Sequence, residues 1–110
     1  MLYASSKAAL NRLSTGLAAE LFDAGIAVNT LAPVAAVITP GVEAMGVVQW
    51  LEPSMIEPVE AMAEAALVLC SCDPASMTGR VAYSLRLLEE LKRPIRTLDG
   101  AALFPDSNPA

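Results

Sequence analysis

A tyrosine and a lysine stand four positions apart near the beginning of the sequence, at Tyr3 and Lys7. On a helix this spacing places both side chains on one face, with their Cβ atoms about 6 Å apart. A tyrosine hydroxyl ordinarily ionises near pH ~10, and an ammonium group favours the phenolate by about 4 kcal/mol in an enclosed cleft but by only about 1 kcal/mol in water. The pair therefore predicts an acid/base centre if a cleft encloses it, and an ordinary solvated helix face if none does.

The sequence contains no histidine, which excludes Ser-His and Cys-His nucleophile pairs and removes the usual zinc ligand. Acid/base chemistry near neutral pH is therefore left to tyrosine, lysine, cysteine or carboxylate groups. The two cysteines, Cys70 and Cys72, are separated by one residue. A disulfide at this spacing would be strained, and two thiols are too few for a zinc site. We expect buried or half-buried structural thiols, a reducing compartment and no metal site, with a redox or metal role as the alternative.

Acidic residues outnumber basic ones, with 12 Asp and Glu against 7 Lys and Arg and a net charge of -5. No lysine or arginine occurs between Arg12 and Arg80. A phosphate backbone would meet mainly repulsion along this stretch, so nucleic acid is excluded as the main partner. A basic group near the C-terminal end could hold an anionic ligand, but Glu89 and Glu90 lie among its members, and a solvated helix face accounts for it.

A mean hydropathy of +0.49 requires that a membrane span be considered. The longest run without a charged residue, 24–42, has 19 residues, close to the length of a spanning helix. It contains Pro33 and Pro40, which would leave a broken backbone in lipid. No basic region leads into an apolar core at the N-terminal end, as a signal peptide would require. We therefore expect a soluble cytoplasmic protein that has no membrane partner.

The Tyr3 and Lys7 pair falls on a predicted helix over residues 3–24, with Gly25 as its C-terminal stop. Leucines recur at spacings of three and four, and this stripe should face a core. The stripe consists of Leu10, Leu13, Leu17 and Leu21. Small residues on the other faces allow a second helix or another subunit to approach closely.

An apolar, β-branched stretch over 26–31 follows the helix and predicts a strand buried on both faces and ended by Pro33. The next segment, 34–54, is rich in turn residues and holds one short apolar piece, 47–51. It predicts a flexible flap, because loops of this length are uncommon unless they cover a site.

The second half of the chain predicts a helix, a strand and a last helix. Pro58 suits the first turn of a helix that should end near Asp73. Residues 80–84 read as a short strand, and 85–92 as a helix that precedes an irregular tail.

The order helix, strand, long loop, helix, strand is that of a parallel α/β unit. With 110 residues, of which 55% are hydrophobic, the chain is one globular domain or part of one. Two parallel strands leave an unpaired edge, and parallel sheets are normally covered on both faces. The sequence therefore predicts an α/β fold that is an incomplete portion of a doubly wound parallel sheet. We assign residues 1–110 to one partial domain, with its core in about 1–84 and a terminal helix and tail in 85–110.

Three segments in order resemble the short-chain dehydrogenase/reductase family. The first is Tyr3-Ala4-Ser5-Ser6-Lys7-Ala8-Ala9-Leu10, which matches the family's Tyr-x-x-x-Lys segment. The second is Gly25-Ile26-Ala27-Val28-Asn29, followed by Pro33. The third is Thr78-Gly79-Arg80-Val81, which is similar to the Thr-Gly pair before the family's last core strand. The resemblance covers about residues 1–84 and leaves the tail unexplained.

This resemblance implies a Rossmann-like sheet that binds NAD or NADP, and hydride transfer between the nicotinamide and a small alcohol or carbonyl substrate. Tyr3 would be the general acid/base, and Lys7 would activate it and bind the nicotinamide ribose. Pro33, Val37 and Thr39 would line the nicotinamide side of the cofactor. The flap would close over the substrate.

The resemblance also implies that the chain corresponds to the C-terminal part of such an enzyme. The family's glycine-rich phosphate turn and catalytic serine precede its tyrosine, and this sequence contains no GxGxxG or P-loop pattern. We therefore expect the 110 residues alone to be inactive, with Tyr3 and Lys7 as half of an active site. The helix over 3–24 would join subunits of a homo-oligomer. The alternative is a non-catalytic α/β remnant or interaction module.

Overall fold

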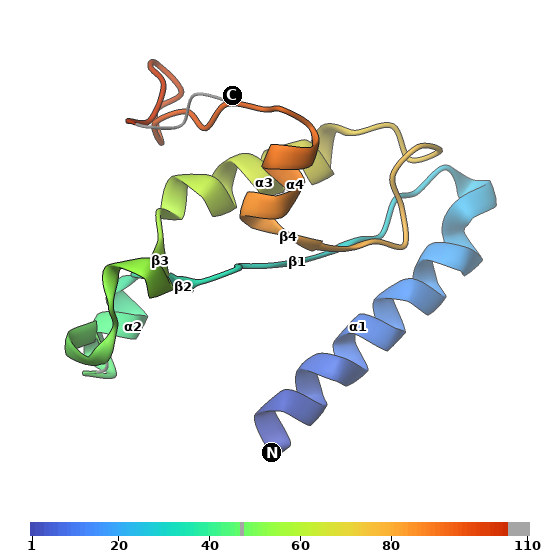
Figure 1. Cartoon of the computed structure of the whole chain (residues 1–110). Coiled ribbons are helices and arrows are strands. Elements are labelled where there is room, and N and C mark those ends of the chain that lie inside the picture. The colour runs from blue at the N-terminus through green and yellow to red at the C-terminus, as the bar shows by residue number, and fades with distance from the viewer. Residues whose placement is uncertain (47, 106–110) are drawn as a thin grey trace.

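The computed structural model describes residues 1–46 and 48–105 as helices alternating with short strands (Figure 1). In chain order the elements are α1 (Leu2–Leu21), the 3-10 turn Phe22–Ala24, β1 (Thr30–Ala32), β2 (Ala36–Val37), α2 (Pro40–Ala44), the 3-10 turns Val48–Trp50 and Pro53–Met55, β3 (Ile56–Glu57), α3 (Val59–Ser71), β4 (Val81–Tyr83) and α4 (Ser84–Glu90). β1 pairs with β4 and β2 pairs with β3, both in parallel. The predicted α/β class with parallel strands is confirmed.

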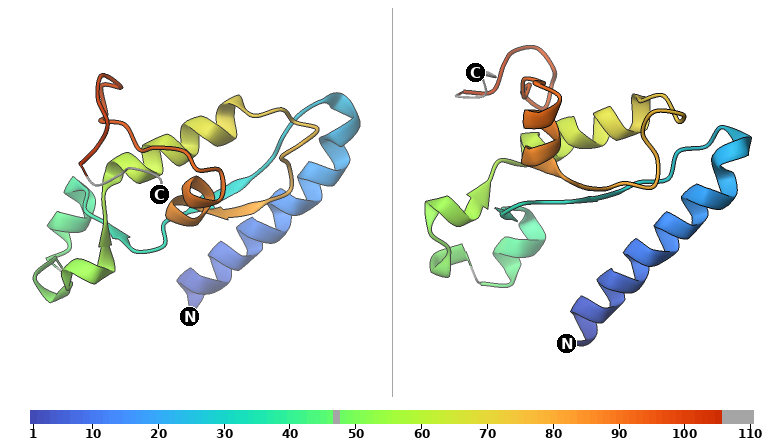
Figure 2. Two further views of the ribbon diagram at one scale, coloured as in Figure 1. Left: turned by 45° about the horizontal axis from the view of Figure 1, so that its top comes forward. Right: turned by 45° about the vertical axis from the view of Figure 1, so that its right-hand side comes forward.

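The helices lie on both sides of the β1–β4 pair. α3 and α4 cover one side, while α1 runs along the other side in the direction opposite to β1 (Figure 1, Figure 2). The buried core forms between β4, α3 and α4, and its residues are Ala61, Ala65, Val68, Ala82, Leu87 and Leu88. The chain exposes 7481 Å² of surface, whereas a compact protein of this mass exposes about 5,800 Å². The chain therefore exposes more surface than a compact fold of its mass, and helix α1 contributes only one buried residue, Ala18.

Helix α1 confirms the predicted helix, but its leucine stripe does not face a core within this chain. Gly25, at φ 73°, donates its N–H to the Phe22 carbonyl and ends the helical segment as expected. Leu10 is 48% exposed and Leu13 is 59% exposed, so the predicted burial of the stripe is wrong for the described chain. The reason is that α1 is buried only near Ala18, that Leu10 lines an open groove, and that no second layer among residues 1–46 and 48–105 covers Leu13.

The strand predicted over 26–31 is shorter and less buried than expected. β1 spans only Thr30–Ala32, and all three of its residues are half-buried rather than enclosed on both faces. Residues before it approach the 77–80 turn through other bonds, since the Val28 N–H donates to the Thr78 hydroxyl at 3.0 Å. Within the described part of the chain β1 pairs along one edge only, which leaves the strand incompletely covered.

The segment predicted as a flexible flap contains regular structure. β2 and α2 form within it, and two 3-10 turns follow. The Thr39 hydroxyl accepts the Val42 N–H at 3.2 Å, and Pro40 occupies the first helical turn, so a side-chain cap starts α2. Val47, at the start of the predicted apolar piece 47–51, lies outside the described residues.

The second half of the chain follows its predicted order. α3 begins at Val59, directly after Pro58, and β4 and α4 succeed each other without a loop. Residues 91–105 contain no helix or strand apart from an isolated antiparallel bridge between Arg96 and Leu103. The end of the predicted tail, 106–110, lies outside the described residues. Within the part of the chain that the structure describes, no helix has the length and apolar character needed to cross a bilayer.

Asn29 closes the turn that brings β4 beside β1. Its amide donates to the Met77 carbonyl at 3.2 Å and accepts the Arg80 N–H at 3.0 Å. This side chain therefore has the structural role expected of a polar residue in a strand region. Gly79 has a φ of +72°, and a Cβ there would lie 3.4 Å from the Ala18 Cβ. Glycine thus permits both the turn and the close approach of α1.

We expect the Asn29→Ala substitution to lower the free energy of unfolding by about 1–3 kcal/mol, because two long-range hydrogen bonds are lost. Urea denaturation followed by circular dichroism measures the change. The Gln49→Ala substitution, at an exposed amide, is the matched control and should change stability by less than about 0.5 kcal/mol. Equal unfolding midpoints for the two variants would show that Asn29 does not hold the turn.

Candidate functional site

A groove of about 500 Å³ separates α1 from β1. The helix contributes one side and the strand the other, and the lining residues are Tyr3, Lys7, Leu10, Asn11, Ser14, Asn29, Thr30, Leu31, Ala32 and Pro33. The groove reaches the carboxyl end of β1, where open parallel sheets bind their ligands. The fold therefore brings the predicted chemical pair to the edge of the sheet where a ligand site is expected.

Tyr3 and Lys7 contact each other on the first turns of α1. The Lys7 Nζ atom lies 5.3 Å from the centre of the Tyr3 ring, in cation-π contact with its face. The Ser6 hydroxyl donates to the Tyr3 carbonyl at 2.6 Å, which fixes that turn of the helix. Tyr3 is 75% exposed, so its hydroxyl is open to solvent. The enclosed cleft that acid/base chemistry requires is not formed by the described residues alone.

The structure brings three of the five predicted site residues into the groove and leaves two beyond it. Tyr3, Lys7 and Pro33 line it, although α1 and the end of β1 are far apart in the sequence. Val37 lies in β2, in register with Glu57 of β3. Thr39 caps α2 through its hydroxyl. The assignment of Val37 and Thr39 to a cofactor site therefore remains a prediction.

Two polar groove residues on α1 were missed at the level of the sequence. Asn11 and Ser14 follow Lys7 by four and seven positions, so they lie on the same face of α1. This helical spacing was the available signal. The two side chains extend the polar wall of the groove away from the Tyr3 hydroxyl and offer hydrogen-bond donors and acceptors to a bound ligand.

The two cysteines line a separate depression of about 390 Å³ beside the 77–80 turn. Cys72 is half-buried, and its thiol donates to the Leu69 carbonyl at 3.4 Å. Cys70 is exposed, which contradicts the expectation that both thiols are at least half-buried. Its position on α3 turns it away from the small core. Among residues 1–46 and 48–105, no group of three or more His, Cys, Asp or Glu side chains is placed to hold a metal ion.

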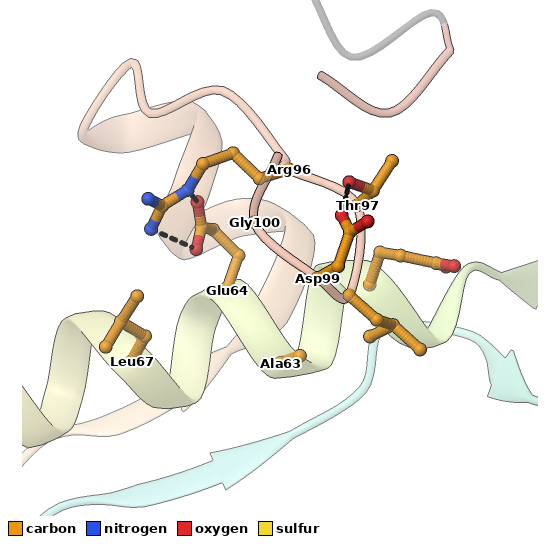
Figure 3. A pocket seen from close by; sticks show the side chains of 9 residues that line it. Ala63, Glu64, Leu67, Arg96, Thr97, Asp99 and Gly100 are labelled. Atoms are coloured by element: carbon orange, nitrogen blue, oxygen red, sulfur yellow. Dashed lines mark hydrogen bonds and ion pairs between the residues drawn. The ribbon is translucent and has the colours of Figure 1, made fainter. Parts of the chain in front are cut away.

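A third hollow, of about 270 Å³, lies between α3 and the loop after residue 95 (Figure 3). Its charged centre is an ion pair. The guanidinium of Arg96 donates two hydrogen bonds to the buried carboxylate of Glu64, at 2.8 and 3.2 Å, and Arg93 approaches the same carboxylate at 3.7 Å. The Arg96 hydrogen bond is the main cause that lowers the pKa of Glu64, against the opposing effect of burial. The opposite charges of Glu64 and Arg96 compensate each other, and this ion pair attaches the loop after residue 95 to α3.

No protein-family model and no curated protein matches the chain. Among solved structures, the chain is similar to the crystal structure of a "putative dehydrogenase" from Xanthomonas campestris. The two are 24% identical with a TM-score of 0.60, over 89% of this chain and 34% of that one. The chain thus spans about a third of the length of that structure. The likeness shows the fold, and the class is therefore α/β with an incomplete Rossmann-like sheet.

We expect the Glu64→Gln substitution to make stability less dependent on pH in the acid range. Glu64 has a lowered pKa in the folded chain against an ordinary value of 4.5. Its ionised form therefore contributes stability above pH ~4.5, and this contribution is lost as the pH falls through the lower, folded-state value. Urea midpoints measured from pH 7 to pH 3 check this.

The difference between wild type and the Glu64→Gln variant should be largest at neutral pH and shrink as the pH falls. The Glu20→Gln variant, at an exposed carboxylate of α1, serves as the control and should follow the wild-type profile. A constant difference between wild type and Glu64→Gln at every pH would contradict the expected linkage.

Proposed function

We propose that the chain supplies the Tyr3 and Lys7 half of the active site of an NAD- or NADP-dependent oxidoreductase of the short-chain type. The observation that carries the proposal is the groove at the carboxyl end of β1, which Tyr3, Lys7 and Pro33 line together. The likeness of the fold to part of a dehydrogenase structure supports it. The three ordered segments that resemble the short-chain family supply the reaction type.

In this proposal the Tyr3 hydroxyl exchanges a proton with the oxygen of a small alcohol or carbonyl substrate. The ammonium group of Lys7 lies against the Tyr3 ring and places a positive charge where negative charge would develop. Asn11 and Ser14 hydrogen-bond polar groups of the ligand farther along the groove. Effective proton transfer then requires further protein to cover Tyr3, because the hydroxyl is exposed in this chain.

The groove suits the nicotinamide and ribose end of a dinucleotide. It combines a lysine, amide and hydroxyl side chains with an apolar wall from Leu31 to Pro33. The described residues hold no glycine-rich turn between a strand and a helix that could bind the pyrophosphate. A bound nicotinamide would supply the hydride acceptor or donor. The proposed dinucleotide is either NAD or NADP.

We also propose that α1 makes a subunit contact in a homo-oligomer. Leu10, Leu13 and Leu17 are exposed along one helix and have no covering layer among the described residues. The same exposed face supports the second candidate function, a non-catalytic α/β module that binds a protein partner through α1. A complete, folded protein containing this chain that binds neither NADH nor NADPH would favour this second function.

In the complete enzyme that contains this chain, we expect the Tyr3→Phe substitution to reduce kcat about 100-fold or more, because the proton-transfer group is removed. Dinucleotide affinity should stay near the wild-type value. Calorimetric titration with NADH and NADPH, followed by steady-state rates with alcohol and carbonyl substrates, measures both quantities. Circular dichroism first establishes that each protein is folded.

The matched control is Tyr83→Phe. Tyr83 is an exposed tyrosine that also contacts a cation, with the Arg86 guanidinium 5.5 Å from its ring centre, but it does not line the groove. This variant should keep wild-type rates. Equal activity of the Tyr3→Phe variant and the wild type would refute the catalytic role of Tyr3.

A further inference from the structure

Glu57, at the end of β3, is a buried carboxylate that lies outside the groove. It is only 2% exposed. The Ser84 hydroxyl contacts its two oxygens at 2.9 and 2.8 Å, and the Val34 N–H donates to Oε1 at 3.0 Å. Among the described residues, Glu57 forms no ion pair with a lysine or arginine. Neutral donors alone therefore compensate the burial of this group.

The three residues of this network come from separate segments that meet at one end of the sheet. Ser84 directly follows β4, and Val34 follows Pro33 at the end of β1. Because Ala32 and Tyr83 are paired in register, both strands end at the same level. The Glu57 carboxylate thus connects the carboxyl ends of the two parallel strands from outside their hydrogen-bond ladder.

The contact with Val34 has a consequence for the groove. Pro33 has no N–H to donate, so the Val34 N–H is the first backbone donor after the groove wall. Its bond to Glu57 sets the direction in which the chain leaves Pro33. Ser84 in turn holds the carboxylate in place, which makes the position of Pro33 depend on the length and orientation of the Glu57 side chain.

We propose that Glu57 is a positioning residue for the dinucleotide end of the groove. It acts through Val34 and Pro33 and touches neither Tyr3 nor Lys7. This inference rests on the proposed function, because it assigns Pro33 to the wall against the nicotinamide. Loss of the correct Glu57 geometry should weaken dinucleotide binding and leave the proton-transfer step unchanged.

Two substitutions separate side-chain length from charge. Glutamine has the length of glutamate, and its oxygen can accept from both Val34 and Ser84 while its amide donates to the Ser84 hydroxyl. Aspartate keeps the charge but is one methylene shorter, so it cannot span the same distances. A positioning role predicts that Glu57→Gln preserves function and Glu57→Asp does not.

In the complete enzyme that contains this chain, we expect the Glu57→Asp substitution to raise the KM for the dinucleotide about tenfold, because small displacements at a binding wall are costly. The kcat at saturating dinucleotide should remain within about threefold of the wild type, and the Glu57→Gln variant should keep both constants within about threefold. The exposed Glu89 on α4 provides matched controls. Glu89→Asp and Glu89→Gln should both match the wild type.

Hydrogen exchange of the Val34 amide measures the strength of its hydrogen bond to Glu57 independently of enzyme activity. Glu57→Asp should accelerate this exchange about tenfold or more, and Glu57→Gln should leave it within about threefold of the wild type. If the Glu57→Asp variant does not fold, the Glu57→Gln variant tests the positioning role of Glu57 instead. A dinucleotide KM or Val34 exchange rate in Glu57→Gln that departs more than about tenfold from the wild type would overturn the positioning role.

Failure of the two proposals gives different results. A complete wild-type enzyme, containing this chain, that binds neither dinucleotide overturns the proposed function and the affinity role of Glu57 with it. A wild type that binds, together with a folded Glu57→Asp variant of unchanged KM and unchanged Val34 exchange, overturns only the role of Glu57. A kcat that falls while KM stays constant would also contradict positioning and would place Glu57 in the chemical step.

Discussion

The parallel pairing of β1 with β4 is the contact on which the rest of the structure depends. It joins segments about 50 residues apart in sequence, as the bond from Arg80 to Asn29 shows. Without it β1 has no paired edge, and the helix face that carries Tyr3 and Lys7 has no wall opposite it. The same pairing places Ser84 beside the end of β1, where the Glu57 carboxylate reaches both strands. The turn closed by Asn29, the groove between α1 and β1 and the buried network of Glu57 thus all depend on the pairing of β1 with β4.

Two carboxylates are buried among the residues that the structure describes, and they are satisfied in different ways. Glu64 meets the guanidinium of Arg96, and the resulting pair attaches the tail to α3. Glu57 meets only a hydroxyl and a backbone N–H. Both sets of bonds are directed, because the Arg96–Glu64 pair is bidentate and hydrogen bonds weaken steeply away from linear geometry. The Glu57 network is the one that lies next to the groove, through Val34.

Local signals in the sequence predicted the helices and their ends well. Gly25 stops the first helical segment, and the spacing of Tyr3 and Lys7 places them on one face, because both features depend on neighbours along the chain. The exposure of the leucine stripe, the shortness of β1 and the burial of Glu57 depend on which distant segments meet. No periodic pattern carries that information. Thr39 followed by Pro40 was a readable cap signal for α2, and its turn-rich surroundings obscured it.

The contact between Ala18 and Gly79 makes the part of α1 from Tyr3 to Ala18 an arm that would tilt about this contact. Fifteen residues separate Tyr3 from Ala18, and at 1.5 Å per residue the arm is about 22 Å long. A tilt of about 5° around the contact moves the tyrosine by about 2 Å, and a misplacement of about 1 Å can cost 100-fold in rate. Whatever surface covers Leu10, Leu13 and Leu17 therefore sets the angle of the arm. A subunit contact on these leucines would therefore also set the position of the Tyr3 hydroxyl for proton transfer.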